Sequence, residues 1–108
     1  MKALLYVRSV VADHNDRAAF DDWYGSSHSL EGVQNFGFLR FWRCWSHLDP
    51  SVHYAFYELE DTKHYDRIVN TPAFAEMVAD FTEVWGDRVT RERDVVNIVH
   101  EFSRIRTH

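Results

Sequence analysis

The spacing of hydrophobic residues divides the chain into short segments with two different periods. Four segments are rich in β-branched and aromatic residues that alternate between two faces, which predicts β-strands. They are residues 2–11 (KALLYVRSVV), 38–47 (FLRFWRCWSH), 52–60 (VHYAFYELE) and 88–102. The Asp-Pro-Ser sequence at 49–51 is a turn signal, so the second and third strands are expected to form an antiparallel hairpin.

Between the first two strands the period becomes helical. The segment 17–24 (RAAFDDWY) spaces its apolar residues three or four apart, as one face of an amphipathic helix requires. Gly25 and the two serines after it weaken this helix. We therefore expect the helix either to end there or to bend and continue through Leu30 and Val33.

A second helical region separates the third and fourth strands. Residues 61–70 (DTKHYDRIVN) begin with an acidic cap, and Thr71 followed by Pro72 restarts the helix. Threonine caps helix N-termini well, and proline fits the first helical position. An apolar stripe over residues 74–85 then ends before Gly86, where a C-terminal capping glycine belongs.

The element order β-α-β-β-α-β predicts a ferredoxin-like α+β fold, in which a four-stranded antiparallel sheet carries its helices on one face. The chain is short enough for a single domain, expected over residues 1–103, with a flexible C-terminal tail at 104–108. The other sheet face would then expose aromatic side chains, and exposed apolar patches of this kind mark interfaces. Two copies are expected to pack sheet to sheet as a homodimer, forming an α+β barrel.

The composition narrows the partners of this fold. Of the 108 residues, 16% are aromatic, which is more than one small subunit is expected to bury, so some should line a cavity or a subunit contact. A net charge of −5 without a basic stripe argues against nucleic acid. No apolar run approaches the roughly 18 residues that span a membrane. With one cysteine, Cys44, which is expected to be a small buried hydrophobe, the protein is expected to be cytoplasmic.

His28 is the first candidate for chemistry. In a helix that runs through Gly25, His28 follows Tyr24 by four residues and lies on the same face. A neutral imidazole beside an aromatic wall can take up or return a proton near neutral pH, because its free pKa is about 6.5. The alternative is a histidine that hydrogen-bonds a carbonyl at a helix C-terminus.

Arg40 is the main candidate on the strands, where it shares one face with Phe38 and Trp42. An arginine on an apolar face either binds a carboxylate, phenolate or enolate of a substrate or pairs with a glutamate. The glutamates available are Glu58, Glu92 and Glu101. The candidate substrate-binding residues are Tyr6, Trp23, Tyr24, Arg40, Trp42, Tyr57 and Trp85. Alternation leaves open which sheet face is the pocket and which is the dimer contact.

Two motifs carry a resemblance to a known superfamily. The stretch FDDWYGSSHSLEGV at 20–33 resembles a pattern of an aromatic pair, an acidic residue, two spacers, a histidine and a later proline. The stretch NTPAFAEM at 70–77 resembles the Ser/Thr-Pro-Ala-Phe opening of a last helix. With the element order over about residues 2–102, these motifs make the chain similar to the dimeric α+β barrel superfamily. Within it, the chain resembles the small EthD-like and antibiotic-biosynthesis-monooxygenase-like proteins.

The resemblance implies a cofactor-independent enzyme that acts on a small aromatic or polyketide-like molecule by proton transfer. Such an enzyme would be an isomerase, cyclase or lyase, or a monooxygenase, with His28 as general base or acid. The alternative is a non-catalytic dimeric protein that binds a small ligand or serves an accessory role. Gly25 stands where the family often has an acidic residue, and Leu30 where it often has proline. The carboxylates that could replace the missing one belong to Asp21, Asp22 and Glu31.

No metal or other cofactor is expected. The seven histidines and the single cysteine form no His-x-His, His-Glu-x-x-His or Cys-x-x-Cys spacing. Heme-degrading relatives carry an iron-ligand histidine a few residues after the phenylalanine of the second motif, where this chain has Glu76, Met77 and Val78. A glycine-rich phosphate loop is also absent from the sequence. The expected ligand is a small hydrophobic or aromatic molecule.

Overall fold

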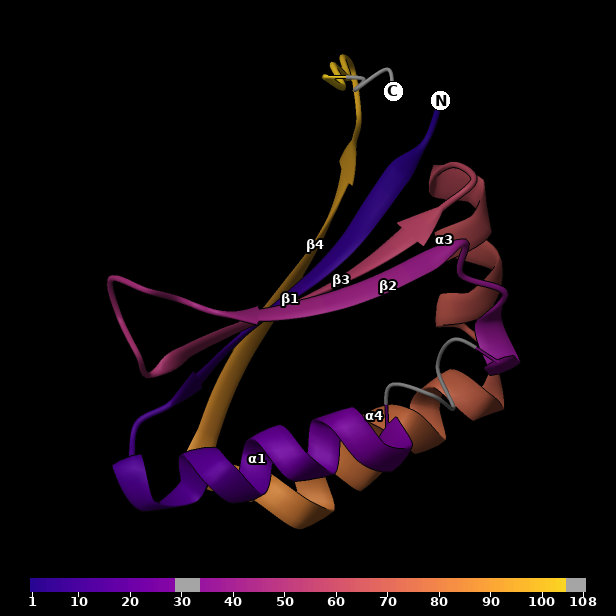
Figure 1. Ribbon diagram of the computed structural model, residues 1–108. Helices are drawn as coiled ribbons and strands as arrows, with labels where there is room; N and C mark the ends of the chain where they lie inside the picture. Colours follow the sequence, from indigo (N-terminus) through magenta and orange to yellow (C-terminus); the bar gives the residue numbers. More distant parts are fainter. Residues whose placement is uncertain (29–33, 105–108) are drawn as a thin grey trace.

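Four strands form one antiparallel sheet in the computed structural model, which describes residues 1–28 and 34–104 and, of these, all side chains except those of Ser27 and His28. The sheet order is β2-β3-β1-β4. The strands are β1 (Ala3–Val11), β2 (Arg40–Trp45), β3 (Val52–Leu59) and β4 (Val89–Asn97). Helices α1 (Arg17–Trp23), α3 (Thr62–Val69) and α4 (Pro72–Trp85) all lie on one side of the sheet (Figure 1). The predicted ferredoxin-like α+β fold is confirmed.

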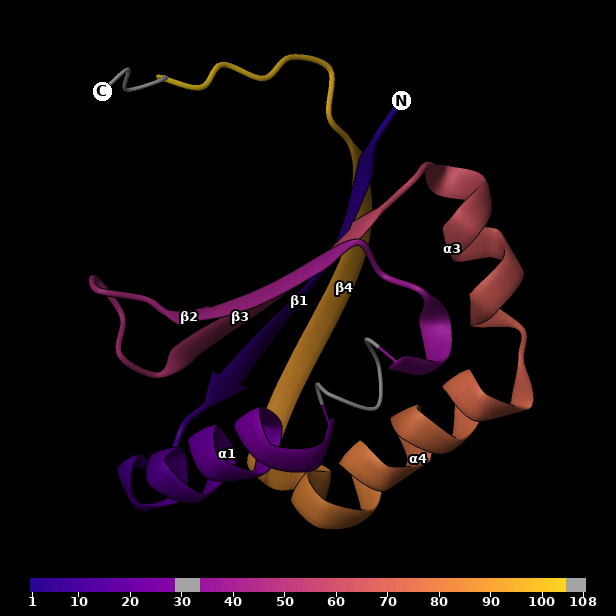
Figure 2. The same ribbon diagram turned by 45° about the vertical axis from the view of Figure 1, so that its right-hand side comes forward.

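Strand pairing follows the predicted scheme. β2 and β3 form the expected antiparallel hairpin, and β1 pairs with both β3 and β4. β4 is shorter than predicted, because it ends at Asn97 instead of continuing to residue 102. Just after it, the Ile98 N–H donates to the Lys2 carbonyl at 2.9 Å, and the chain then extends away from the body (Figure 2).

Alternation along β1 defines the two faces of the sheet. The helix-covered face carries the buried side chains Ala3, Leu5, Val7, Ser9 and Val11. The opposite face, called the open face below, carries the half-buried Leu4, Tyr6, Arg8 and Val10. The same alternation extends to β3, where Ala55 and Tyr57 lie opposite Val7 and Leu5 of β1 and are likewise buried.

The predicted caps are confirmed at α3 and α4. The Asp61 side chain accepts a hydrogen bond from the His64 backbone N–H at 2.9 Å. The Thr71 hydroxyl accepts from the Phe74 N–H at 3.3 Å, ahead of proline in the first turn. Gly86 ends α4 with φ +50° and ψ −126°, a combination that residues with a side chain rarely adopt.

The helix after β1 changes its winding at the glycine motif. α1 ends at Trp23, and the backbone continues as a π-helix over Tyr24–His28. A π-helix bonds residue i to i+5 and is frequent at functional sites. The α-helical spacing that predicts a shared face for Tyr24 and His28 therefore stops at Trp23. The predicted continuation of the helix is confirmed as far as His28, while residues 29–33 lie outside the part that is described.

Two sequence predictions about the second strand are wrong. Phe38 does not share a face with Arg40, because the chain bends at Leu39 and β2 begins only at Arg40. Phe38 instead points to the helix-covered side and is 6% exposed. Cys44 is exposed, because its register opposite Tyr54 places it on the open face.

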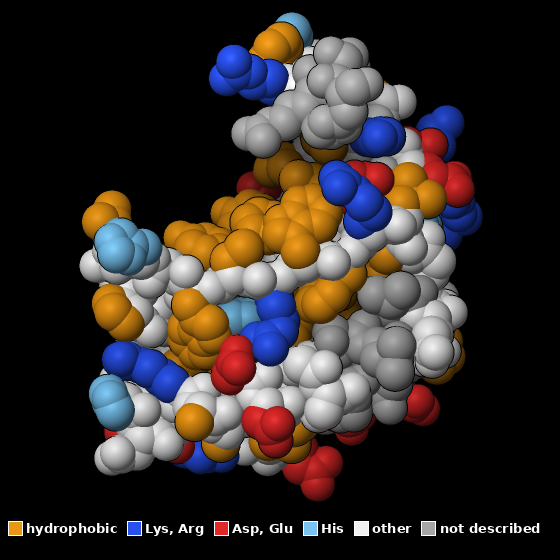
Figure 3. Space-filling view, viewed as in Figure 1, with side chains coloured by type: hydrophobic (Ala, Val, Ile, Leu, Met, Phe, Trp, Pro, Cys, Tyr) orange, Lys and Arg blue, Asp and Glu red, His pale blue; other side chains and the backbone are white. Residues whose placement is uncertain are grey.

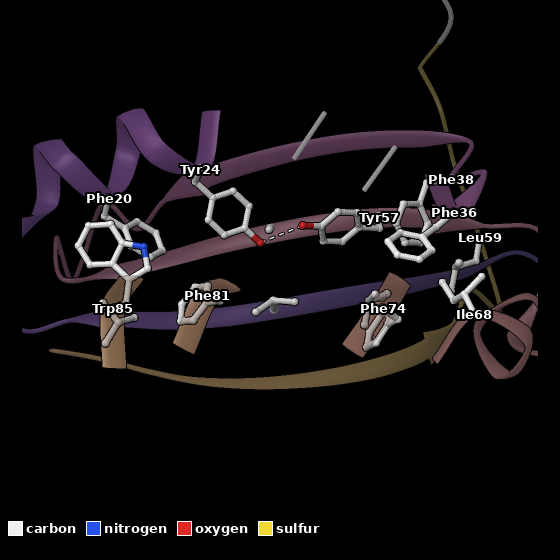
Figure 4. Close-up of a cluster of buried hydrophobic side chains, with 14 of the residues drawn as sticks. Phe20, Tyr24, Phe36, Phe38, Tyr57, Leu59, Ile68, Phe74, Phe81 and Trp85 are labelled. Carbon is white, nitrogen blue, oxygen red and sulfur yellow. Dashed lines mark hydrogen bonds between the residues drawn. The ribbon is translucent and has the colours of Figure 1, made fainter. Parts of the chain in front are cut away.

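An aromatic core fills the space between the sheet and the helices. Phe20 of α1 is fully buried, with ring contacts to Trp85 of α4 at 5.3 Å and to His53 of β3 at 5.2 Å. Figure 4 shows this cluster continuing along the sheet to Phe74 and Phe38. Within residues 1–28 and 34–104, no helix is long and apolar enough to cross a membrane.

Candidate functional site

A cavity of about 230 Å³ lies under the helix-covered face of the sheet. Its apolar wall is formed by Leu5, Val7, Phe38, Phe74, Met77 and Val78. These residues come from β1, the segment before β2, and α4. Ligand sites are commonly concave and mostly apolar, with a few polar groups that fix orientation. The polar groups of this cavity are therefore the candidate site.

Tyr24 and Tyr57 supply two hydroxyl groups to this cavity. Their oxygens lie 2.9 Å apart and share a hydrogen bond, and Figure 4 shows them pointing toward each other from the π-helix and from β3. The residues are 1% and 2% exposed. Burial raises the pKa of Tyr24 to about 12 and holds the pKa of Tyr57 well above 10. Both hydroxyls are thus protonated at neutral pH, and one of them donates a hydrogen bond to the other.

Two arginines of β4 line the cavity from the helix-covered face. The Arg91 Cζ lies 3.8 Å from the centre of the Phe81 ring, and the Arg93 Cζ lies 5.0 Å from the centre of the Phe74 ring. Burial lowers the pKa of the half-buried Arg91 guanidinium. The cavity therefore combines an apolar wall, two neutral hydroxyls and positive charge.

A polar cluster beside the cavity joins α1 to the hairpin. Asp21 accepts hydrogen bonds on one oxygen from Arg43 Nη1 at 2.6 Å and from Trp45 Nε1 at 2.8 Å. The hydrogen bond from Arg43 and, to a smaller extent, that from Trp45 lower the pKa of Asp21. His53 is fully buried, with Nε2 3.4 Å from Arg43 Nη1. Burial, helped by Arg43, lowers the pKa of His53 to about 4, so this imidazole is neutral near pH 7 and a weak base.

Gly25 has a specific steric role in this cluster. A Cβ atom at this position would lie 2.7 Å from Arg43 Nη2, closer than real contacts allow. The place where the resembled proteins often carry an acidic residue is thus next to a guanidinium here. Of the possible replacement carboxylates, Asp21 is engaged by Arg43 and Trp45, Asp22 is exposed, and Glu31 lies outside the described residues.

The predicted site residues do not gather in one place. Tyr24 and Tyr57 line the cavity. Trp85 is buried in the core, and Trp23 packs beside it with ring centres 6.0 Å apart. The side chain of His28, the predicted base, is outside the described part of the structure, so its role stays a prediction.

Three further candidates lie on the open face, across the sheet from the cavity. Trp42 stacks on Phe56 at 5.4 Å, and Tyr6 lies 6.4 Å from the same ring. Arg40 forms an ion pair with Glu58 at 2.9 Å. Of the three glutamates named as possible partners of Arg40, the partner is therefore Glu58. In the described part of the chain, the ring and ion-pair contacts of Tyr6, Arg40 and Trp42 are with other residues of the open face.

Sequence reasoning missed the polar groups that flank the tyrosines. His53 follows from alternation, because it shares a strand face with Tyr57, and Arg91 and Arg93 follow from counting alternate residues from the buried Val89. The pairing of Asp21 with Arg43 carries no local signal, since it depends on how α1 docks on the sheet. In residues 1–28 and 34–104, no cluster of His, Cys, Asp and Glu is arranged to hold a metal ion.

Solved structures of other proteins share this ferredoxin-like fold. A mutant of SnoaB, a cofactor-independent oxygenase from Streptomyces nogalater, aligns with a TM-score of 0.70 at 14% identity, covering 95% of this chain and 98% of that one. An EthD family protein from Bacillus halodurans aligns with a TM-score of 0.66 at 13% identity, covering 89% and 99%. A dimeric ferredoxin-like protein from an uncultured marine organism aligns with a TM-score of 0.60 at 14% identity, covering 94% and 98%.

These likenesses establish the fold, which is the fold that the resemblance implies. No family model matches the chain, and no curated protein matches it in sequence.

Proposed function

We propose that this chain is a cofactor-independent enzyme that acts on a small aromatic or polyketide-like molecule by proton transfer, with His28 as general base or acid. One observation carries the proposal: two buried tyrosine hydroxyls, 2.9 Å apart, lie within one apolar cavity. The name of SnoaB, a cofactor-independent oxygenase with the same fold, supports this reaction class.

The tyrosine pair suits a reaction that builds negative charge on oxygen. Removing a proton from carbon beside a carbonyl, or from a phenol, leaves an enolate or phenolate. Neutral donors held in a dry site stabilise such an oxyanion more than water does, because they are oriented in advance. The raised pKa values of Tyr24 and Tyr57 keep both groups protonated, so one hydroxyl can donate to the oxyanion while it accepts the hydrogen bond of the other.

The base has to come from outside the described cavity wall. Glu92 contributes to the lining, but its side chain is 67% exposed and lies 3.8 Å from Arg8. His53 has a pKa of about 4 and does not line the cavity. His28 ends the π-helix that begins with Tyr24, which supports it as the group that exchanges protons with a bound molecule.

The test is hydrogen–deuterium exchange of 2-tetralone, a bicyclic aromatic ketone with an acidic C–H bond, followed by proton NMR in D₂O. We expect the protein to accelerate exchange. His28→Ala should lower the enzymatic rate at least about 100-fold, as removal of a general base does. Tyr57→Phe should lower it by a similar factor, as loss of an oxyanion donor does. Arg67→Gln, on an exposed position of α3, is the control. Unchanged exchange in His28→Ala would remove this residue from the mechanism.

A non-catalytic binding protein is the second candidate, and the cluster at Gly25 favours it. Asp21, a carboxylate near the histidine motif, is engaged by Arg43 and Trp45, so it is not set to orient a base. In that case 2-tetralone would quench tryptophan fluorescence on binding without any faster exchange.

We also propose a homodimer built on the open face. Tyr6, Trp42, Tyr54 and Phe56 place aromatic rings there, all of them half-buried in the single chain. Figure 3 shows hydrophobic side chains gathered over this surface, which is hollowed between the hairpin and the C-terminal segment. The name of the dimeric ferredoxin-like neighbour supports this assembly. Sedimentation should give twice the 12.9 kDa of one chain, and a monomer at micromolar concentration would refute it.

A further inference from the structure

Among the described residues, Arg91 of the cavity has no carboxylate partner within 4.0 Å. Its guanidinium is half-buried on the helix-covered face of β4. In the part of the chain that is described, the arginines with an acidic partner within 4.0 Å are Arg8, Arg40, Arg43 and Arg88. Moving a charge out of water without a counter-charge is unfavourable. An arginine placed in this way is therefore ready to receive an anion.

The contact with Phe81 leaves the hydrogen-bonding groups of Arg91 available. With Cζ 3.8 Å from the ring centre, the guanidinium engages the ring by cation–π attraction. The N–H groups of a guanidinium lie in its plane and fit the two oxygens of a carboxylate. The ring thus supports the cation, while the in-plane donors remain for a ligand.

Other groups of the cavity reinforce this position. Arg93, two residues along the same strand face, also lines the cavity and adds a second positive charge. Arg91 interacts electrostatically with both Tyr24 and Tyr57 and favours negative charge on either. Positive charge and neutral donors therefore act on one small volume, most of whose remaining wall is apolar.

We propose that Arg91 binds the carboxylate of the substrate, which makes the substrate class a small aromatic or polyketide-like acid. This inference rests on the proposed function, because it takes the cavity as the substrate site. The apolar wall contacts the carbon skeleton, and the guanidinium fixes the acid group at the β4 side. The tyrosine hydroxyls then face the part of the molecule where charge develops.

Two probes of equal shape test the inference by calorimetry: 1-naphthoate, which is anionic, and 1-naphthamide, which is neutral. Wild type should bind naphthoate at least about 10-fold more tightly, as hydrogen bonds to charged groups imply. Arg91→Gln should remove this preference while keeping the affinity for naphthamide, which also verifies folding. Arg91→Lys should keep only part of it, because lysine has charge without the planar fork. Arg67→Gln, an exposed arginine on α3, should behave as wild type.

The outcomes separate this inference from the function on which it rests. Equal affinity for both probes in wild type, unchanged by Arg91→Gln, would overturn the carboxylate site and leave the cavity standing as a binding site for neutral molecules. A naphthoate preference that survives in Arg91→Gln would also overturn it. Failure of both probes to bind wild type would overturn the carboxylate site together with the aromatic cavity of the proposed function.

Discussion

Replacing Asp21 by asparagine tests the link between α1 and the hairpin. Asparagine keeps an acceptor for Trp45 but removes the charge that pairs with Arg43, now 2.6 Å away. A hydrogen bond to a charged group contributes about 1.5–3 kcal/mol when it is protected from water. The Asp21 side chain is 48% exposed, so solvent screening reduces this contribution. We expect Asp21→Asn to lower the free energy of unfolding by about 1 kcal/mol.

The assay is urea denaturation at one fixed protein concentration, because a dimer makes stability depend on concentration. Asp22→Asn is the matched control, since it makes the same chemical change on the next, exposed residue of α1, and should cost less than about 0.5 kcal/mol. The folded-state pKa of Asp21 lies below its ordinary 3.8, so its stabilisation is present above pH 3.8 and disappears as pH falls through the folded value. The difference between wild type and Asp21→Asn should therefore close in acid. Equal stability of wild type and both variants at pH 7 would refute the proposed link.

Three other predictions concern the core, a turn and the interface. Phe20→Ala, at a fully buried position, should lower the free energy of unfolding by about 3–5 kcal/mol, measured by urea denaturation. A loss below about 1 kcal/mol would show that the aromatic core is not tightly packed there. Gly86→Ala should lower the free energy of unfolding by about 1–3 kcal/mol, because alanine is strained at this positive φ. A Cβ there would meet no atom within 4 Å, so the loss comes from the backbone and not from a steric clash, and an unchanged stability would contradict the backbone conformation. Phe56→Arg should yield a folded monomer in sedimentation, and a persistent dimer would show that the open face is not the contact.

Local sequence patterns were sufficient for most of the fold. Alternation and capping residues specify the strands and the two helix starts, because these depend on neighbours a few residues away. The prediction for Phe38 is wrong because a bend at Leu39 breaks the alternation before β2 begins. β4 was predicted too long because the apolar residues after Asn97 continue the pattern although the sheet does not.

The site was less predictable, because both faces of the sheet carry aromatic residues. Tyr57 and Trp42 are equally plausible pocket residues from alternation, and only the docking of the helices buries one and leaves the other on the open face. The hydroxyl pair of Tyr24 and Tyr57 joins residues 33 positions apart. Such a contact requires the tertiary structure and leaves no pattern in the sequence. Arg91 lies in a charged segment of the sequence, and it can be assigned to the helix-covered face only once Val89 is known to be buried.

The close approach of Gly25 and Arg43 means that substitutions at these two positions affect each other. A Cβ at position 25 would lie 2.7 Å from Arg43 Nη2, so the guanidinium that pairs with Asp21 would have to shift. Mutations at positions 25 and 43 should thus be non-additive, as expected for residues that share a partner. An engineer who wishes to place a carboxylate at position 25 should shorten residue 43 first. That first step would leave Asp21 with its bond from Trp45 but without its ion pair, so the second substitution would add a carboxylate near one that has lost its positive partner.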